Sequence, residues 1–253
     1  HSLHFATEKE LSSFHNVSFS APWFIHAAEG TDQVAVSEFE QLARYGFIAP
    51  NLVIVHGVGI QWQEVRKQAP WKIKGLVWCP STNEYLLGQT ADLKSCREAD
   101  IVKHLALGSD SRLTADGDLL DEMCAAIQSQ QINAYELTKM VTVDAGLLIQ
   151  NQPSLLCENM PADFILKIRT DNDVIELCNS RRADLALVVK GGVPQIGDPD
   201  VMAKFPHIQT VAATLDGKPK RIQVDLARRI HQNKLKEPGL EVDELPKQKF
   251  RIW

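Results

Sequence analysis

The sequence predicts an α/β protein in which a parallel sheet of strand–helix units, residues 1–150, precedes a smaller β-rich region, residues 151–253. Residues 51–56 form a nearly continuous aliphatic run, which is typical of a strand buried on both faces. Short apolar runs of this kind alternate with segments of helical apolar spacing, as in βα units. After about residue 150 the pattern changes to short strands joined by turns.

Five strands are expected in the first region, at 2–6, 22–28, 51–56, 75–79 and 104–107. Helices are expected at 8–14, 31–45, 61–68, 117–128 and 134–145. The helix at 31–45 carries Val34, Phe39 and Leu42 near 3.6-residue spacing. Thr31 is a candidate cap for its N-terminus, and Gly46 ends it. Pro80 closes the fourth strand and is followed by a polar loop.

The second region is expected to form strands at 162–168, 183–190, 193–196 and 211–215. The tripeptide Asp216-Gly217-Lys218 is a hairpin turn signal. A charged helix at 222–236 follows, and the tail after Pro238 is polar. The chain therefore divides into a βα region, 1–150, and a β-sandwich-like region with a C-terminal helix and tail, 151–253.

The composition excludes several classes of partner. The net charge is −5 and no basic block stands out, so we expect no nucleic acid partner. No apolar run reaches the ~18 residues of a membrane span, and the first residues do not resemble a signal peptide. The five cysteines are odd in number and none are at C-x-x-C spacing, which indicates free thiols in the cytoplasm.

A histidine and a glutamate close the strand at 22–28. His26 ends the apolar run, and Glu29 follows in the turn. An imidazole can bind a divalent metal, and a nearby carboxylate can carry a proton between water and a leaving group. Taken alone, the pair equally fits a surface histidine beside an exposed glutamate.

Two further strands end in residues that can bind metal. His56 ends the buried run at 51–56 and is followed by glycines, which allow a ligand to approach the backbone closely. Asp110 follows the strand at 104–107 in a small-residue loop, where a carboxylate can complete a metal shell or act as a base. The alternatives are a buried histidine satisfied by hydrogen bonds and an aspartate that caps the next helix.

An aromatic side chain and a polar loop follow the remaining strand. Trp78, Ser81 and Asn83 suit the wall of a pocket for a flat substrate. The alternative is a packed tryptophan followed by an asparagine-containing turn.

Taken in order, these motifs resemble the amidohydrolase superfamily, in particular its aminohydrolase branch of chlorohydrolases and deaminases. The matching segments are 24–30, 52–59, 75–83, 105–120, 140–148 and 183–188. The resemblance implies a partial (β/α)₈ TIM-type barrel, about strands four to eight, followed by strands of the C-terminal β-sandwich. It also implies a metal-dependent hydrolase that attacks a C–N or related C–X bond of a small heterocycle or amidine.

The resemblance implies a role for each candidate. His26, His56 and Asp110 would bind one divalent metal, zinc with iron as the alternative. Glu29 would be the proton shuttle. His56 and Asp110 would also act on the attacking water and the substrate, and Trp78, Ser81 and Asn83 would line the pocket.

The sequence departs from the family pattern at the H-x-H pair, which supplies two further metal ligands in that family. His1 and His4 have a different spacing and do not substitute for it. We therefore expect that this chain alone is inactive, with metal weakly bound or absent, and that a missing N-terminal segment or a second chain completes the barrel. A homo-oligomer is also expected. The alternatives are a compact open sheet and a non-catalytic remnant or binding module on the same scaffold.

Overall fold

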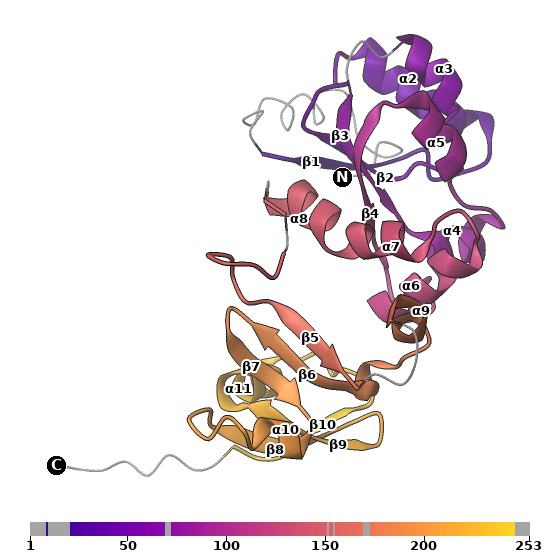
Figure 1. Cartoon of the computed structure of the whole chain (residues 1–253). Coiled ribbons are helices and arrows are strands. Elements are labelled where there is room, and N and C mark those ends of the chain that lie inside the picture. The colour runs from indigo at the N-terminus through magenta and orange to yellow at the C-terminus, as the bar shows by residue number, and fades with distance from the viewer. Residues whose placement is uncertain are drawn as a thin grey trace. The chain divides into compact units, whose positions relative to one another are not determined.

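In a computed structural model of the chain, residue 9 and residues 21–68, 72–150, 152–153, 155–168 and 173–245 are described. The chain divides into two compact units, His1–Ser154 and Leu155–Trp253, and each is considered by itself (Figure 1). The strand expected at 2–6 lies outside the described residues, and so does the helix at 8–14 except for Lys9. Within the described parts, no helix has both the length and the apolar character that crossing a bilayer requires.

Unit 1 contains a parallel four-stranded sheet in the order β1-β2-β3-β4. Its strands are β1 (Trp23–Ala27), β2 (Leu52–His56), β3 (Ile73–Trp78) and β4 (Val102–Leu107). All five residues of β2 are buried, as its aliphatic run predicts. The α/β class and the parallel sheet are confirmed, and the sequential strand order is the one that (β/α) barrels use.

The helices of unit 1 are α2 (Gln33–Arg44), α3 (Trp62–Gln68), α4 (Pro80–Leu87), α5 (Leu93–Ala99), α6 (Leu119–Gln128), α7 (Ala134–Val141) and α8 (Val143–Gln150). Asp32, and not Thr31, caps α2, since its side chain accepts the Ala35 amide. The expected helix at 134–145 is divided at Thr142 into α7 and α8. The expected loop after Pro80 is helix α4, because proline is well tolerated at the first helical position.

Both faces of this sheet are covered by helices. On one face, Leu76 of β3 lies close to the Trp62 side chain of α3, near Gly57. On the other face, Leu148 of α8 packs with Val53 and Ala106. A Cβ on Gly75 would lie 2.3 Å from the Leu148 Cδ2 atom, so this glycine admits α8.

The face covered by α8 is also the face that carries His26. In the β1–β2 register His26 pairs with Val55, which lies two residues after Val53 and therefore on the same face. His104 of β4 and Asp144 of α8 lie 3.2 Å apart and link strand to helix. Within the described residues the sheet is thus open and helix-covered, with no closure into a barrel.

Unit 2 is a six-stranded antiparallel sheet in the order β10-β8-β9-β7-β6-β5. Its strands are β5 (Phe164–Lys167), β6 (Leu185–Lys190), β7 (Val193–Gly197), β8 (Thr210–Leu215), β9 (Lys218–Gln223) and β10 (Leu240–Val242). Short helices α9 (Asp173–Cys178), η2 (Arg182–Asp184) and α10 (Pro199–Met202) and the longer α11 (Val224–Gln232) complete it.

The hairpin predicted at Asp216-Gly217 is confirmed, with φ values of 48° and 80° at the two residues. Residues 218–223, which the sequence reading did not assign to a strand, form β9, the partner of β8. The helix expected at 222–236 therefore begins two residues later, at Val224.

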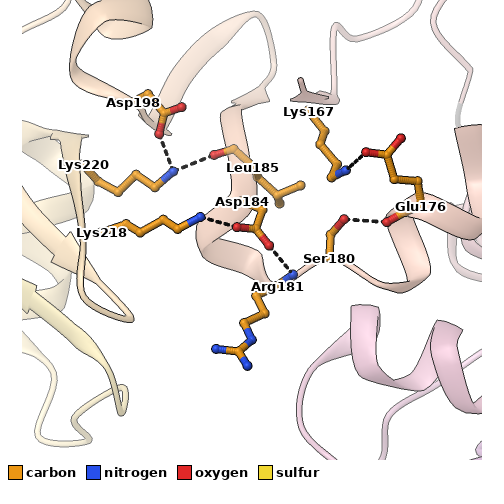
Figure 2. A network of polar contacts seen from close by, with 9 residues as sticks. All are labelled: Lys167, Glu176, Ser180, Arg181, Asp184, Leu185, Asp198, Lys218 and Lys220. Atoms are coloured by element: carbon orange, nitrogen blue, oxygen red, sulfur yellow. Dashed lines mark hydrogen bonds and ion pairs between the residues drawn. The ribbon is translucent and has the colours of Figure 1, made fainter. Parts of the chain in front are cut away.

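Lysine–carboxylate pairs link β9 to η2 and to Asp198, and link β5 to α9, in unit 2 (Figure 2). The buried Lys220 ammonium donates to Asp198 at 2.5 Å and to the Leu185 carbonyl at 2.8 Å. Lys218 pairs with Asp184, and Lys167 pairs with Glu176 at 2.6 Å, as the sticks in Figure 2 show. Each of these three lysines has a carboxylate partner, which satisfies its charge within the fold.

Candidate metal centre

The turn after β1 is held in an unusual backbone conformation. Ala28 has φ of 53°, in the left-handed region that alanine rarely adopts. Its amide donates to the Glu38 carboxylate of α2 at 2.5 Å, and Glu38 is 5% exposed. This bond fixes the path of the chain between His26 and Glu29, so Glu29 returns toward the end of its own strand.

The end of β2 has the same feature. His56 has φ of 72°, is fully buried, and is followed by Gly57 with φ of 65°. Left-handed backbone at a bulky residue costs on the order of 1–3 kcal/mol, so neighbouring contacts must hold it in place. One such contact is the Asn83 Oδ1 atom, 2.9 Å from the His56 Nδ1 atom.

Three side chains converge where these strands end. The His56 Nε2 atom lies 3.2 Å from the His26 Nδ1 atom and 3.5 Å from the Glu29 Oε2 atom. The Glu29 Oε2 atom lies 3.9 Å from the His26 Nδ1 atom. In the parallel register Ala27 pairs with His56, which places the two strand ends side by side. The structure thus brings His26, Glu29 and His56 together at the carboxyl edge of the sheet, and their roles as metal ligands and proton shuttle stay predictions.

The geometry of this group fits a divalent metal. Two imidazole nitrogens bound to a tetrahedral ion at ~2.05 Å lie ~3.3 Å apart, close to the 3.2 Å between His26 and His56. The ligand atoms of all three residues lie within 4.8 Å of one another, and among the described residues this is the group that can hold an ion. Nitrogen and oxygen donors of this kind suit zinc or iron. The side chains of His26 and Glu29 are 38% and 34% exposed, so water reaches the group.

The imidazoles also set the ionisation of the carboxylate. A hydrogen bond with His26 lowers the pKa of Glu29, burial opposes this, and the charges of His56 and His26 lower the pKa further. Glu29 is therefore ionised and can accept a proton or an ion.

Asp110 does not join this group. It lies beyond the end of β4, is exposed, and has φ of 51°. The thiol of Cys79 is buried, and its pKa is raised by burial first and then by Glu122, Asp110 and Glu29. Asp110 follows β4 in the chain, and its role as a metal ligand and base stays a prediction.

The residues predicted to line the pocket are buried, and Asn83 among them contacts His56. Trp78, Ser81 and Asn83 are 0%, 6% and 1% exposed. The Trp78 indole donates to the Thr90 hydroxyl at 2.7 Å, and the Ser81 hydroxyl donates to the Glu122 carboxylate at 2.5 Å. In this structure the three side chains therefore make internal hydrogen bonds, and their role toward a substrate stays a prediction.

Sequence reasoning missed Glu38 and Glu122, although helical spacing contains a signal for both. Glu38 lies between Ala35 and Leu42 on the buried face of α2, and Glu122 lies one turn before Ala126 on the buried face of α6. Glu122 also accepts the Ser81 amide at 2.8 Å, which satisfies an N-terminal amide of α4 that its own cap residue leaves free. A carboxylate on an apolar helix face marks a contact that must be satisfied internally.

Comparison with known proteins finds relatives by structure. No family model and no curated protein sequence matches the chain. A zinc-containing adenosine deaminase from Xanthomonas campestris matches with 17% identity and a TM-score of 0.63, over 82% of this chain and 54% of its own. An atrazine chlorohydrolase from Arthrobacter aurescens, in complex with zinc and atraton, matches with 14% identity and a TM-score of 0.61, over 76% and 48%.

A 5-methylcytosine deaminase from Klebsiella pneumoniae, with bound phosphonocytosine, matches with 14% identity and a TM-score of 0.55, over 76% of this chain and 54% of its own. An amidohydrolase from Brucella melitensis matches at 19% identity. The chain spans about half the length of these structures. It has the fold of the corresponding part of the amidohydrolases and deaminases.

Proposed function

We propose that this chain is part of a metal-dependent hydrolase that cleaves a C–N or related C–X bond of a small heterocycle or amidine. The observation that carries the proposal is the convergence of His26, Glu29 and His56 at metal-binding distances on two strand ends. The fold that the chain shares with a zinc-containing deaminase and a zinc-containing chlorohydrolase supports the proposal. A single divalent ion, zinc with iron as the alternative, is the proposed cofactor.

The proposed roles of His26, His56 and Glu29 follow from their positions, and that of Asp110 follows from the resemblance to the amidohydrolase superfamily. His26 and His56 hold the ion through facing nitrogens, and Asp110 completes the shell and acts as base. A bound divalent ion supplies Lewis-acid activation of water. Glu29 would carry a proton from the attacking water to the leaving group, because its oxygen lies 3.5–3.9 Å from the two imidazoles that would hold the ion.

Further parts of the proposal concern the rest of the assembly. Residues outside the described part of the chain, or a second polypeptide, supply the remaining metal ligands and close the sheet, and homo-oligomerisation is one route to this closure. Trp78, Ser81 and Asn83 line the pocket in the completed site. The five cysteines are free, which fits a cytoplasmic protein.

A second candidate function is a non-catalytic binding module. The packing of α8 on the sheet face that carries His26 favours it, because the helix occupies space beside the candidate site. The two candidate functions require the same fold, but only the hydrolase would turn over a substrate.

The deciding experiment measures ammonia or halide release from a panel of aminopyrimidines and s-triazines by the zinc-supplemented protein. Because this chain alone is expected to be inactive, the assay is made with the segment that supplies the remaining metal ligands present. We then expect release that Glu29→Gln abolishes and that Glu40→Gln, an exposed carboxylate of α2, leaves unchanged. Glu29→Gln should still bind zinc, since Glu29 is proposed as a proton carrier. Zinc binding without release from any panel member, once the remaining metal ligands are supplied, would favour the binding module.

A further inference from the structure

A chain of hydrogen bonds runs behind the metal-facing side of His56. The Trp78 indole Nε1 donates to the Thr90 Oγ1 atom at 2.7 Å, and the Asn83 Nδ2 atom donates to the same oxygen at 3.0 Å. The Asn83 Oδ1 atom lies 2.9 Å from the His56 Nδ1 atom. The side chains of Trp78, Asn83 and His56 are almost completely buried, so water cannot replace these partners.

The orientation of the Asn83 amide, with its nitrogen toward Thr90 and its oxygen toward His56, decides where the His56 proton lies. The Trp78 indole only donates, so the Thr90 oxygen must accept there. With the Asn83 amide nitrogen also donating to Thr90, the remaining Asn83 oxygen can only accept from His56. The Nδ1 atom of His56 is then protonated, and the Nε2 atom carries a lone pair. That lone pair faces the His26 Nδ1 atom at 3.2 Å and the Glu29 carboxylate at 3.5 Å.

We propose that Asn83, held by Thr90, is a positioning residue that fixes the Nδ1-protonated tautomer of His56 and so keeps its Nε2 lone pair available to a metal ion. The role differs from the substrate contact expected for Asn83, because the residue acts through His56. The value of the lone pair for a metal rests on the proposed function. The tautomer itself does not.

The N-terminus of α4, which carries Asn83, is itself held in place. Asn83 lies in the first turn of α4, whose entry Glu122 fixes by accepting both the amide and the hydroxyl of Ser81. The amide oxygen therefore reaches His56 from a helix held at its N-terminus. A metal-bound histidine is commonly oriented by a hydrogen bond to its other nitrogen, and loss of that partner costs ~10–100-fold in metal affinity.

The test is ¹⁵N NMR of the histidine side chains in the metal-free protein at pH 8, above the ordinary histidine pKa of ~6.5. The His56 signals are assigned by their loss in His56→Gln. We expect a protonated Nδ1 and an unprotonated Nε2 in the parent protein, and a shift toward protonated Nε2 in Asn83→Leu. Asn83→Asp keeps an acceptor and should keep the parent tautomer.

Asn51→Leu is the matched control, since Asn51 is also buried but bonds to the Ala21 carbonyl away from the site. It should leave the His56 tautomer unchanged. Thr90→Val should behave as a weaker version of Asn83→Leu, whereas Thr90→Ser should not. The same variants are titrated with Co²⁺, and a ~10–100-fold loss of affinity is expected for Asn83→Leu.

A protonated Nε2 in the parent protein would overturn the proposal, because it requires the Asn83 amide to be oriented the other way. An unchanged tautomer in folded Asn83→Leu would overturn it as well. If that variant does not fold, the parent spectrum and Thr90→Val decide. The predicted tautomer without any Co²⁺ binding would count against the proposed function and leave this inference standing.

Discussion

The Glu29 carboxylate of unit 1 has different partners from the carboxylates of the lysine network in unit 2. In unit 2, Glu176, Asp184 and Asp198 each pair with a lysine (Figure 2). In unit 1, the ion-pair partners of Glu29 among the described residues are the imidazoles of His26 and His56. An ammonium group has no lone pair for a metal, whereas a neutral imidazole has one. The unit 2 network therefore stabilises a fold, and the unit 1 group can also bind an ion.

The backbone conformation also differs between the candidate metal group of unit 1 and the lysine network of unit 2. Ala28 and His56 both adopt left-handed φ beside the candidate metal group. The buried Lys220 of unit 2 projects from a regular strand, β9. Strained backbone that is held by buried contacts is commonly associated with functional sites. The difference separates a stabilising charge network from a candidate reactive one.

The largest effect on stability is expected for Asp198→Ala. This change leaves the Lys220 ammonium buried with only the Leu185 carbonyl as a described partner, and a buried charge without its partner costs about 3–5 kcal/mol. Urea unfolding followed by circular dichroism measures the loss. Asp200→Ala, two residues on and exposed, should change the unfolding free energy by less than ~0.5 kcal/mol. Equal losses of unfolding free energy in the two variants would show that Asp198 is not needed to stabilise the buried Lys220 charge.

His56→Asn should have a small effect on stability and a large effect on metal affinity. Asparagine tolerates left-handed φ, so the unfolding free energy should change by no more than ~2 kcal/mol, while metal affinity falls at least ~100-fold. Calorimetric titration with Zn²⁺ and urea unfolding of the same sample separate the two effects. Parent-like zinc affinity in His56→Asn would break the comparison between the units.

Glu122→Gln tests the buried carboxylate that holds α4. Burial raises the pKa of Glu122, and its hydrogen bonds with Ser81 oppose this. A carboxyl group whose folded pKa is raised contributes stability at low pH that is lost as pH rises through the folded value. The Tm of the variant relative to that of the parent should therefore rise as the pH is raised above 4.5, the ordinary pKa of glutamate, because glutamine keeps an acceptor without the charge. A Tm difference independent of pH would show that burial does not perturb this group.

The smallest effect is expected for Lys218→Ala. The Lys218 side chain is 56% exposed, and an exposed ion pair contributes ~0–1 kcal/mol. The unfolding free energy should fall by less than ~1 kcal/mol, and 1 M salt should reduce the difference. A loss comparable with that of Asp198→Ala would mean that the network acts as one unit.

The parallel strands could be predicted because their aliphatic runs reflect burial on both faces, as in β2. The site followed from the same strands, because residues at the carboxyl ends of adjacent parallel strands meet at one edge. That rule placed His26 and His56 together, with Glu29 in the adjoining turn. It does not predict the position of a side chain several residues into a loop. Asp110 is such a residue, and it lies outside the group.

Other features depend on contacts that sequence patterns do not contain. Pro80 both ends β3 and starts α4, and the sequence alone supports only the first role. The bonds from Asn83 to Thr90 and to His56 join separate elements, so they follow from the packing of α4 and not from local spacing. The sequence predicts Asn83 as a pocket-lining residue, but it does not indicate which side chains Asn83 contacts.

The central claim, that His26 and His56 hold one divalent ion, is tested most directly by Co²⁺ titration followed by visible absorption. The protein as purified is expected to hold less than one equivalent of metal. Added Co²⁺ should bind saturably at one equivalent with the d–d bands of a tetrahedral nitrogen and oxygen site. His26→Ala should abolish these bands and Asp198→Ala should keep them. Absence of saturable binding in the parent, or the same bands in His26→Ala, would contradict the account.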